Sequence, residues 1–438
     1  MSVRPIIPAA GPVTGSVRPP GSRSLTNRAL MAAALAEGTS DLEPVGLSDD
    51  TRICAEALRT LGISIQVDEA HRRMRVVGCA GSVPRPPKAG RLGRPGPKEI
   101  FTGDSGTATR FLTALAAAGR GRYRVDGSPR MRERPIQDLL DGLASLGVRA
   151  ESEAHSGCPP VVLETEGLRG GEVRVSGSVS SQFLSALLMA APAASGPVRI
   201  VVAGELVSRP YVDMTLAVMA DFGVRVRREG YARFEVPAPA AYRARRYAVE
   251  PDASSASYFL ASAAVTGGRV TVEGLARDSA QGDARFADLL AAMGCRVEWS
   301  DAGVTVAGPP QLRGIRADMN AMPDMVPTLA PLALLARGPT VIENVANLRV
   351  KESDRLAALA TELGRLGAEI EERPDGLAIT PPAKVQAAQV ATYHDHRIAM
   401  GMAVIGLVVP GLSIAGAECV SKTYPEFFED LERLAARP

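Results

Sequence analysis

The chain has 438 residues, a net charge of +2 and only 4% aromatic residues. This length is enough for two or three domains that each bury a core. The near-neutral charge and scarce aromatic residues argue against nucleic acid or an anionic membrane as the main partner. Five scattered cysteines, none at CxxC spacing, predict reduced thiols, a cytoplasmic location and no zinc ribbon.

One pattern recurs six times along the chain. Five amphipathic helices end in a glycine that stops the helix before a short strand. These glycines are Gly62, Gly147, Gly223, Gly294 and Gly367, spaced 85, 76, 71 and 73 residues apart. Each unit also has an earlier helix of small apolar residues, such as "NRALMAAALAEG" or "RIAMGMAVIGL", which should be buried because it is apolar nearly all round. The period indicates an α/β unit of two helices and about four strands, and the sixth unit ends without its last strand.

Three stretches bear on how the units are organised. The six units could form one superhelix or two domains of three, and the basic, partly irregular segment around residue 250 is a plausible crossover between them. Residues 82–99, rich in Pro, Gly and basic residues, predict a solvated surface loop rather than a site for an acidic partner.

Residues 398–417 carry no charge, but Pro410 and Gly411 divide them, so we expect a buried helix and a buried strand rather than a membrane span.

Candidate functional residues gather where the helices start. In chain order they are Arg23, Ser24 and Arg28; Asp104, Gly106, Thr107 and Arg110; Arg134; Ser180, Ser181 and Gln182; Ser208 and Tyr211; Asp324; Asn347, Lys351, Glu352 and Arg355; Asp395, His396 and Arg397; and Lys422. A helix start offers free N–H groups and a partial positive charge, which suits bound anions. Serine, threonine and glycine can cradle phosphate there, and arginine can bind carboxylate or phosphate in a bidentate manner. If these helix starts face one cleft, that cleft binds a strongly anionic ligand.

The segment "RVKESDRLAALATELGRLGAEI" (residues 349–370) shows why a ligand is expected. Its leucines form one stripe at helical spacing. Lys351 and Arg355 are four residues apart, so a helix running through them would place both cations on one face at its positive end, at a cost of roughly a few tenths of a kcal/mol. We interpret this arrangement as a binding site for a small molecule with two or three negative charges.

Several other classes of site are disfavoured by their missing motifs. The "HDH" at residues 394–396 could bind a metal ion, but the chain has only four histidines, so no metal site is expected. There is no GxxxxGK[ST] for a P-loop kinase, no GxGxxG after a strand for a dinucleotide fold, and no GxSxG for an α/β-hydrolase.

The segments "GSVSSQFLSALLMAAP", "MRERPI", "NLRVKESDRL" and "DHRIAMGMAV" closely resemble the 5-enolpyruvylshikimate-3-phosphate synthase family, and the similarity runs over nearly the whole chain. The resemblance implies an α/β (α+β) fold: a two-domain inside-out α/β barrel of six βαβαββ-type repeats, three per domain, with the active site in the interdomain cleft. It implies one domain of residues 1–22 plus 251–438, an inserted domain of residues 23–250, and hinges near 20–24 and 247–252. The family expectation is a monomer.

The resemblance also implies a reaction. The carboxyvinyl group of phosphoenolpyruvate would pass to the 5-hydroxyl of shikimate 3-phosphate, giving 5-enolpyruvylshikimate 3-phosphate and phosphate through a tetrahedral intermediate, in aromatic amino-acid biosynthesis. No metal or organic cofactor is implied. The partners would be these two small molecules, with no nucleic acid and no membrane.

Residue roles carry over by motif. Shikimate 3-phosphate would be held by Arg23, Ser24, Arg28, Ser180, Ser181, Gln182, Ser208, Tyr211, Asp324, Asn347 and Lys351. Phosphoenolpyruvate would be held by Arg23, Asp104, Gly106, Thr107, Arg134, Gln182, Arg355, Arg397 and Lys422. The implied catalytic residues are Asp324 as base at the 5-hydroxyl, Glu352 for the methylene proton, Lys422 or His396 for departure of phosphate, and Arg23.

Two positions depart from the family pattern. The family usually has Lys at the position of Arg23 and Asn at the position of Asp104. Arginine keeps the charge but cannot give up a proton at working pH, and a carboxylate beside an anion site weakens binding. Both positions belong to the phosphoenolpyruvate side, so we expect altered affinity for that substrate.

Two other functions are disfavoured by the sequence. A related carboxyvinyl transferase could act on a different phosphorylated acceptor in secondary metabolism, but Ser24, Arg28 and Tyr211 suit the carboxylate of shikimate. The UDP-sugar relative normally has a reactive cysteine on a mobile loop, and none of the five cysteines has a matching context. An inactive binding protein or nucleic-acid module is disfavoured by the complete acid–base set.

Overall fold

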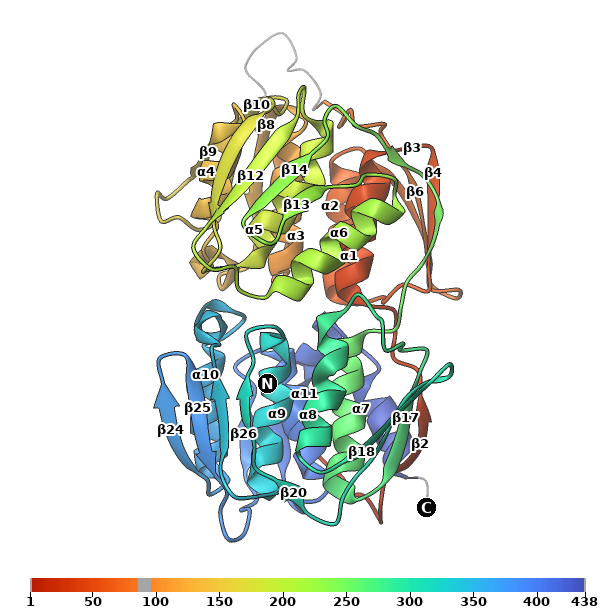
Figure 1. Ribbon diagram of the computed structural model, residues 1–438, viewed down its shortest axis with the longest axis vertical. Coiled ribbons are helices and arrows are strands. Elements are labelled where there is room, and N and C mark those ends of the chain that lie inside the picture. The colour runs from red at the N-terminus through yellow and green to blue at the C-terminus, as the bar shows by residue number, and fades with distance from the viewer. Residues whose placement is uncertain (1, 86–95, 437–438) are drawn as a thin grey trace. The chain divides into compact units, whose positions relative to one another are not determined.

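The computed structural model describes residues 2–85 and 96–436 of the chain (Figure 1). Residues 86–95, the middle of the loop predicted at 82–99, lie outside the described part. The chain divides into two compact units. The inserted unit is Gly21–Val249, and the discontinuous unit joins Met1–Pro20 to Glu250–Pro438.

The described part of each unit contains three pairs of α-helices. In the inserted unit these are α1 (Arg23–Leu35) with α2 (Asp49–Thr60), α3 (Gly106–Ala117) with α4 (Gln137–Ser145), and α5 (Ser181–Ala190) with α6 (Arg209–Asp221). In the discontinuous unit they are α7 (Ala253–Thr266) with α8 (Phe286–Ala292), α9 (Val326–Leu332) with α10 (Arg355–Arg365), and α11 (His396–Gly406) with α12 (Phe427–Ala435). The first helix of each pair is buried along most of its length, and every residue of α11 is buried. The prediction that the apolar helices are buried is confirmed.

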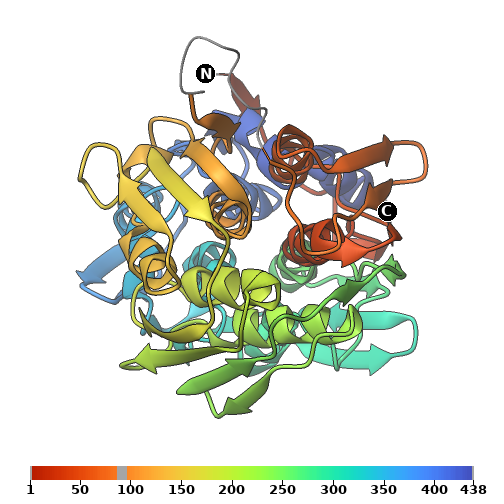
Figure 2. The same cartoon turned by 90° about the horizontal axis from the view of Figure 1, so that it is seen from above.

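Each helix pair of the inserted unit has a four-stranded sheet. The first sheet contains β4 (Thr39–Glu43), β5 (Ser64–Asp68), β6 (Arg73–Val77) and β16 (Arg246–Ala248). The second contains β7 (Lys98–Phe101), β8 (Arg120–Asp126), β9 (Arg149–Ser152) and β10 (Val161–Glu166), and the third β11 (Gly171–Ser176), β12 (Val198–Ala203), β13 (Arg227–Glu229) and β14 (Arg233–Val236). Figure 2 shows these sheets around the helices of the unit, with the buried helices inside.

The discontinuous unit repeats this arrangement. Its sheets are β2 (Thr14–Val17) with β17 (Arg269–Glu273), β18 (Arg296–Ser300) and β19 (Gly303–Ala307); β21 (Arg316–Asp318) with β23 (Thr340–Glu343), β24 (Glu369–Arg373) and β25 (Gly376–Thr380); and a three-stranded sheet of β1 (Val3–Pro5), β26 (Gln389–Ala391) and β27 (Ser413–Ala415). Short parallel pairs join β3 (Ala36–Glu37) to β15 (Tyr242–Arg243) in the inserted unit and β20 (Leu312–Arg313) to β22 (Ala336–Arg337) in the discontinuous unit. The sixth repeat therefore ends in α12 without a further described strand, as predicted, and the six-repeat α/β fold is confirmed.

In each unit, one sheet is completed by a strand that is distant in sequence from its partner. β2 comes just before α1 in the sequence but pairs in parallel with β17 of the discontinuous unit. β16 comes just before α7 but pairs in parallel with β4 of the inserted unit. The first sheet of each unit is therefore completed by a strand from the chain segment that leads out of that unit.

One local prediction was wrong. The sequence suggested that a helix runs through both Lys351 and Arg355, but a 3₁₀ helix, η6 (Ala346–Val350), ends before Lys351 and α10 begins at Arg355. The reason is the Asp354 carboxylate, which caps α10 by accepting the Ala357 N–H at 3.1 Å. Lys351 therefore lies in a loop, and the expected repulsion along one helix face does not arise.

The uncharged stretch 398–417 forms most of α11, which is buried as predicted, and then β27, in which Ile414 is buried and its two neighbours are only partly buried. Over the described ranges, we find no helix long and apolar enough to cross a membrane.

Candidate active site

Three cations surround one carboxylate in the discontinuous unit. Asp324 lies in the 3₁₀ helix η4 (Pro323–Met325), and its carboxylate oxygens are 3.0 Å from Arg355 Nη1, 3.1 Å from Arg397 Nη2 and 3.4 Å from Lys351 Nζ. Burial alone would raise the pKa of Asp324, but the cations Arg397, Lys351 and Arg355 outweigh it and hold this pKa well below its usual range. Asp324 is therefore ionised at working pH, and it is a weak base while the cations remain on it.

A second, deeper carboxylate holds the same arginine. Asp395 is fully buried and Arg355 is 1% exposed. Arg355 Nε donates to Asp395 Oδ2 at 2.7 Å, Ser353 Oγ donates to the same oxygen at 3.1 Å, and the Arg397 N–H donates to Oδ1 at 3.0 Å. Burial would lower the pKa of Arg355, but the nearby carboxylates, led by Asp395, raise it above its ordinary value. Asp395 thus caps α11 and fixes Arg355 at once.

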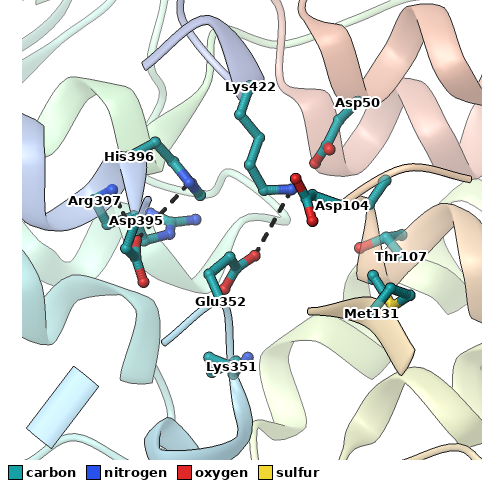
Figure 3. A network of polar contacts seen from close by, with 12 residues as sticks. Asp50, Asp104, Thr107, Met131, Lys351, Glu352, Asp395, His396, Arg397 and Lys422 are labelled. Atoms are coloured by element: carbon teal, nitrogen blue, oxygen red, sulfur yellow. Dashed lines mark hydrogen bonds and ion pairs between the residues drawn. The ribbon is translucent and has the colours of Figure 1, made fainter. Parts of the chain in front are cut away.

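Glu352 and Lys422 complete this network. Arg355 Nη2 donates to Glu352 Oε2 at 2.9 Å, and Lys422 Nζ lies 3.9 Å from Glu352 Oε1. Figure 3 shows Lys422 and Glu352 pointing toward each other. His396 is 1% exposed, and its Nδ1 lies 3.9 Å from Asp395 Oδ1. Four cations and three carboxylates of the described chain thus leave the network with one net positive charge, so it favours anions.

Asn347 lies in η6, which packs against η4 and therefore against the helical turn that carries Asp324. The loop between η6 and α10 then carries Lys351 and Glu352. The short segment "NLRVKESDR" therefore supplies three of the predicted site residues, Asn347, Lys351 and Glu352.

In the inserted unit, Arg28 is a buried cation. It is 3% exposed on α1, and it donates from Nε to Thr215 Oγ1 at 2.8 Å and from Nη1 and Nη2 to the carbonyls of Ser24 and Tyr211 at 3.0 Å each. These three acceptors are neutral, and burial lowers the pKa of Arg28 to about 10. A bound anion would stabilise this guanidinium. The structure thus brings Ser24, Arg28 and Tyr211 together, and it adds Thr215, which lies one helical turn after Tyr211.

The starts of α3 and α5 form a second cluster in the inserted unit. The two helices pack together, and Gln182 Nε2 donates to Thr107 Oγ1 at 3.2 Å between them. Arg134 packs so closely on Gly106 that a Cβ at this position would lie 2.6 Å from Arg134 Nη2. Free backbone N–H groups at a helix start beside a guanidinium are a suitable phosphate site. Glycine at position 106 is therefore required for the approach of Arg134.

Three serines lie at the starts of α5 and α6. Ser180 caps α5, its Oγ accepting the Gln182 N–H at 3.2 Å, and Ser181 is 5% exposed. Ser208 precedes α6 with a left-handed backbone (φ 57°), which is uncommon for a residue other than glycine. Such backbone positions cluster at functional sites.

The two residues that depart from the family pattern have partners of their own. Arg23 Nη1 lies 2.5 Å from Asp50 Oδ2, and Asp50 is 3% exposed on its side chain. Asp104 Oδ1 accepts a hydrogen bond from Ser128 Oγ. Asp50 was missed from the sequence because nothing there distinguishes it from Asp49, the other acidic residue at the start of α2.

Metal binding gains no support from the geometry. Across residues 2–85 and 96–436, we find no group of three or more His, Cys, Asp or Glu side chains arranged to hold a metal ion. The sequence at residues 394–396 instead provides a turn residue, a helix cap and a buried histidine.

Comparisons with known proteins agree with one another. A family profile described as EPSP synthase (3-phosphoshikimate 1-carboxyvinyltransferase) matches residues 7–431. The 3-phosphoshikimate 1-carboxyvinyltransferase of Sulfurovum sp. (strain NBC37-1) is 47% identical over 425 residues, covering 97% of each chain. The chloroplastic enzyme of Petunia hybrida is 47% identical over 435 residues, covering 96% of this chain and 83% of the relative.

Solved structures share the fold over nearly the whole chain. EPSP synthase from Acinetobacter baumannii matches with a TM-score of 0.81 at 25% identity, covering 99% of this chain and 98% of that one. The enolpyruvyl transferase NikO from Streptomyces tendae matches with a TM-score of 0.76 at 20% identity, covering 99% and 97%, and at that identity it shows the fold alone. With the profile match and the close relatives, these comparisons place the chain in the EPSP synthase (3-phosphoshikimate 1-carboxyvinyltransferase) family.

Proposed function

We propose that the protein transfers the carboxyvinyl group of phosphoenolpyruvate to the 5-hydroxyl of shikimate 3-phosphate, releasing phosphate, as a step of aromatic amino-acid biosynthesis. The observation that carries this proposal is the convergence of Lys351, Arg355 and Arg397 on the Asp324 carboxylate, with Glu352 bonded to the same Arg355. This arrangement supplies cations for anionic substrates and two carboxylates for proton transfer in one place.

Binding of the donor, phosphoenolpyruvate, would change the pKa of the proposed base, Asp324. Arg355 and Arg397 would bind the carboxylate of phosphoenolpyruvate, and their electrostatic interaction with Asp324 would then be weaker. Since those cations depress the pKa of Asp324, this pKa rises as the donor binds, and the carboxylate becomes a better base. The free protein thus keeps Asp324 ionised, and the bound donor makes it reactive.

The chemistry then proceeds by addition and elimination. Asp324 takes the proton of the 5-hydroxyl as the hydroxyl oxygen bonds to C2 of the donor, while Glu352 in its protonated form gives its proton to C3. In the second step Glu352 removes a proton from C3 and the C2–O bond to phosphate breaks. Lys422 or His396 supplies the proton that the departing phosphate needs. Fixed cations around both substrates stabilise the charge that develops.

The remaining residues divide between the two substrates. Ser24, Arg28 and Tyr211 would bind the carboxylate of shikimate 3-phosphate, Ser180, Ser181, Ser208 and Lys351 its phosphate or hydroxyls, and Asn347 a ring hydroxyl. Gly106, Thr107, Arg134, Gln182 and Lys422 would hold the phosphate of phosphoenolpyruvate, with Arg23 and Asp104 modulating its affinity. Gln182 and Arg23 would also contact shikimate 3-phosphate.

Both units would therefore serve one pair of substrates. We infer two domains, residues 1–22 plus 251–438 and residues 23–250, that hinge near 20–24 and 247–252 when the substrates bind. The enzyme would act as a monomer in the cytoplasm without a metal or organic cofactor.

The test is phosphate release from phosphoenolpyruvate by the purified protein. We expect release that requires shikimate 3-phosphate and scales with enzyme. A UDP-sugar and a shikimate 3-phosphate analogue without the ring carboxylate serve as control acceptors, because Arg28 has no partner on either. Release with a control acceptor and none with shikimate 3-phosphate would reject the proposal in favour of a relative with another substrate.

A further inference from the structure

The turn that leads into α11 has an unusual backbone. Tyr393 and His394 have positive φ angles of 53° and 56°, and the Asp395 N–H donates to the Thr392 carbonyl at 2.8 Å. Two central residues with positive φ, closed by this bond, are the features of a type I′ turn, which normally holds Asn, Asp or Gly. A Cβ makes this conformation unfavourable. The turn ends at Asp395 and leads into Arg397 of the proposed donor site.

The corresponding turn of the inserted unit uses glycine. Before α3, the Ser105 N–H donates to the Thr102 carbonyl at 3.0 Å, and the residue after Thr102 is Gly103, with a φ of 53°. The same backbone angle is thus built from glycine in one repeat and from Tyr393 in another. Since glycine adopts this angle without strain, a tyrosine at this position needs other contacts that offset the strain.

One such contact is a bond to a buried carboxylate. Glu362 on α10 is 1% exposed, and its carboxylate accepts from Tyr393 Oη at 2.9 Å and from the Ala391 N–H at 3.2 Å. Arg365 donates to the same carboxylate at 2.9 Å. Hydrogen bonds to a charged acceptor are stronger than neutral ones. The turn is therefore held by its side chain against the backbone strain.

Side chains on one face of α10 bind the turn segment at both of its ends. Arg355 and Glu362 are seven residues apart, two helical turns, so they lie on the same face. Arg355 binds Asp395 at the end of the turn, and Glu362 binds Ala391 before it and Tyr393 within it.

We propose that Glu362 and Tyr393 are positioning residues: their bond fixes the strained 392–395 turn and, through it, the placement of Arg397 and His396 for the donor. This inference rests on the proposed function for its kinetic consequence only. Neither residue touches the reacting groups, and both act through the start of α11.

The kinetic test compares Tyr393→Phe with wild type. Loss of the hydroxyl should raise the KM for phosphoenolpyruvate about tenfold, which is less than the roughly 100-fold effect of misplacing a group by a full ångström. The KM for shikimate 3-phosphate should stay within about twofold of wild type. Glu362→Gln removes the charge from the acceptor and also weakens its bonds to Arg365 and the Ala391 N–H, so its effect should be at least as large. The double variant should be no worse than Glu362→Gln alone, because the Tyr393 hydroxyl acts through Glu362. Tyr231→Phe is the matched control: it removes a tyrosine bond to the Asp213 carboxylate outside this segment and should change neither KM.

Rescue separates positioning from loss of fold. His394→Gly relieves backbone strain in the turn, so adding it to Tyr393→Phe should return the KM for phosphoenolpyruvate most of the way to wild type. A Tyr393→Phe variant with unchanged kinetics, or with both KM values raised equally and no rescue, would overturn the proposal.

Hydrogen exchange tests the turn without any activity. In Tyr393→Phe the amides of residues 391–397 should exchange about tenfold faster than in wild type or Tyr231→Phe, the factor expected from loss of one charged hydrogen bond. Unchanged exchange refutes the positioning role, even in a protein that releases no phosphate. Absent phosphate release in the wild type, with accelerated exchange in the variant, instead refutes the proposed function and supports the role of the turn.

Discussion

Replacing Asp324 with asparagine removes a carboxylate on which three cations converge. The substitution keeps the size of the side chain and an oxygen acceptor, but Lys351, Arg355 and Arg397 lose their shared negative partner. Each of these pairs, at 3.0 to 3.4 Å, is worth about 5 kcal/mol at an effective dielectric of about 20, before the desolvation that offsets most of it.

The net effect is smaller and can be measured. Breaking a buried ion pair by removing one partner costs about 3 to 5 kcal/mol, and the remaining amide oxygen places Asp324→Asn at the low end. We therefore expect a loss of about 3 kcal/mol in the free energy of unfolding, or about 6 to 12 °C in Tm for a unit of this size. Turnover should fall to background, because the base at the 5-hydroxyl is gone.

The chain offers a direct probe for this unit. Its single tryptophan, Trp299, lies on β18 of the discontinuous unit, so urea unfolding followed by its fluorescence reports on the unit that contains Asp324. Glu371→Gln, which breaks an exposed pair with Arg373, is the control and should leave the midpoint unchanged. Inorganic phosphate should stabilise Asp324→Asn more than wild type, because the cations then lack their carboxylate. A loss under about 1 kcal/mol, the range of a surface pair, would refute this reasoning.

The same variant carries a pH signature with a definite sign. Because the pKa of Asp324 is depressed in the folded protein, its stabilisation is present above the unfolded value of about 3.9 and is lost as the pH falls toward the folded value. The difference in stability between wild type and Asp324→Asn should therefore be constant from about pH 5 to 8 and shrink below about pH 4. A difference that grows on acidification would contradict the assigned ion pairs.

Three further predictions follow from the other sites. Arg28→Met removes a cation whose pKa burial depresses to about 10, so Tm should stay level or rise while the KM for shikimate 3-phosphate increases about 100-fold; a large loss of stability with unchanged KM would oppose this role. Asp104→Asn removes one negative charge near the anion and should lower the KM for phosphoenolpyruvate about two- to tenfold. Arg23→Lys keeps the charge but changes the hydrogen-bond geometry, so it should also alter this KM, and unchanged KM values in both variants would refute the expected role of these positions. Because the clustered cations repel one another without substrates, small-angle scattering should show compaction when both substrates are added, and identical curves would exclude closure.

Much of the fold could be predicted because its signals are local. A helix that is apolar all round has to be buried, and α11 is buried at every residue. Glycines such as Gly62 and Gly367 stop the amphipathic helices with positive φ angles of 95° and 102°. By contrast, β2 and β16 pair with strands more than 200 residues away in sequence, and nothing in four or fewer strand residues specifies a partner so distant.

The site was predictable in its members but not in its connections. Side-chain types and helix starts identified Arg355 and Arg397, but a sequence cannot tell that Asp395 bonds to Arg355, because an acidic residue before a helix is adequately explained as a cap. The start of α10 was misplaced for a related reason: Ser353 and Asp354 both suit a cap, and only Asp354 accepts the Ala357 N–H. The roles of Glu362 and Tyr393 arise from a backbone angle that no side-chain pattern reveals.

A crystal structure with shikimate 3-phosphate and phosphoenolpyruvate, or an unreactive analogue of the donor, tests most directly whether both sets of residues serve one pair of substrates. We predict that shikimate 3-phosphate contacts Arg28 of the inserted unit and Lys351 of the discontinuous unit at the same time, and that the donor carboxylate lies on Arg355 and Arg397. Substrates held by one unit alone, with Arg28 or Arg397 far from any ligand, would contradict it.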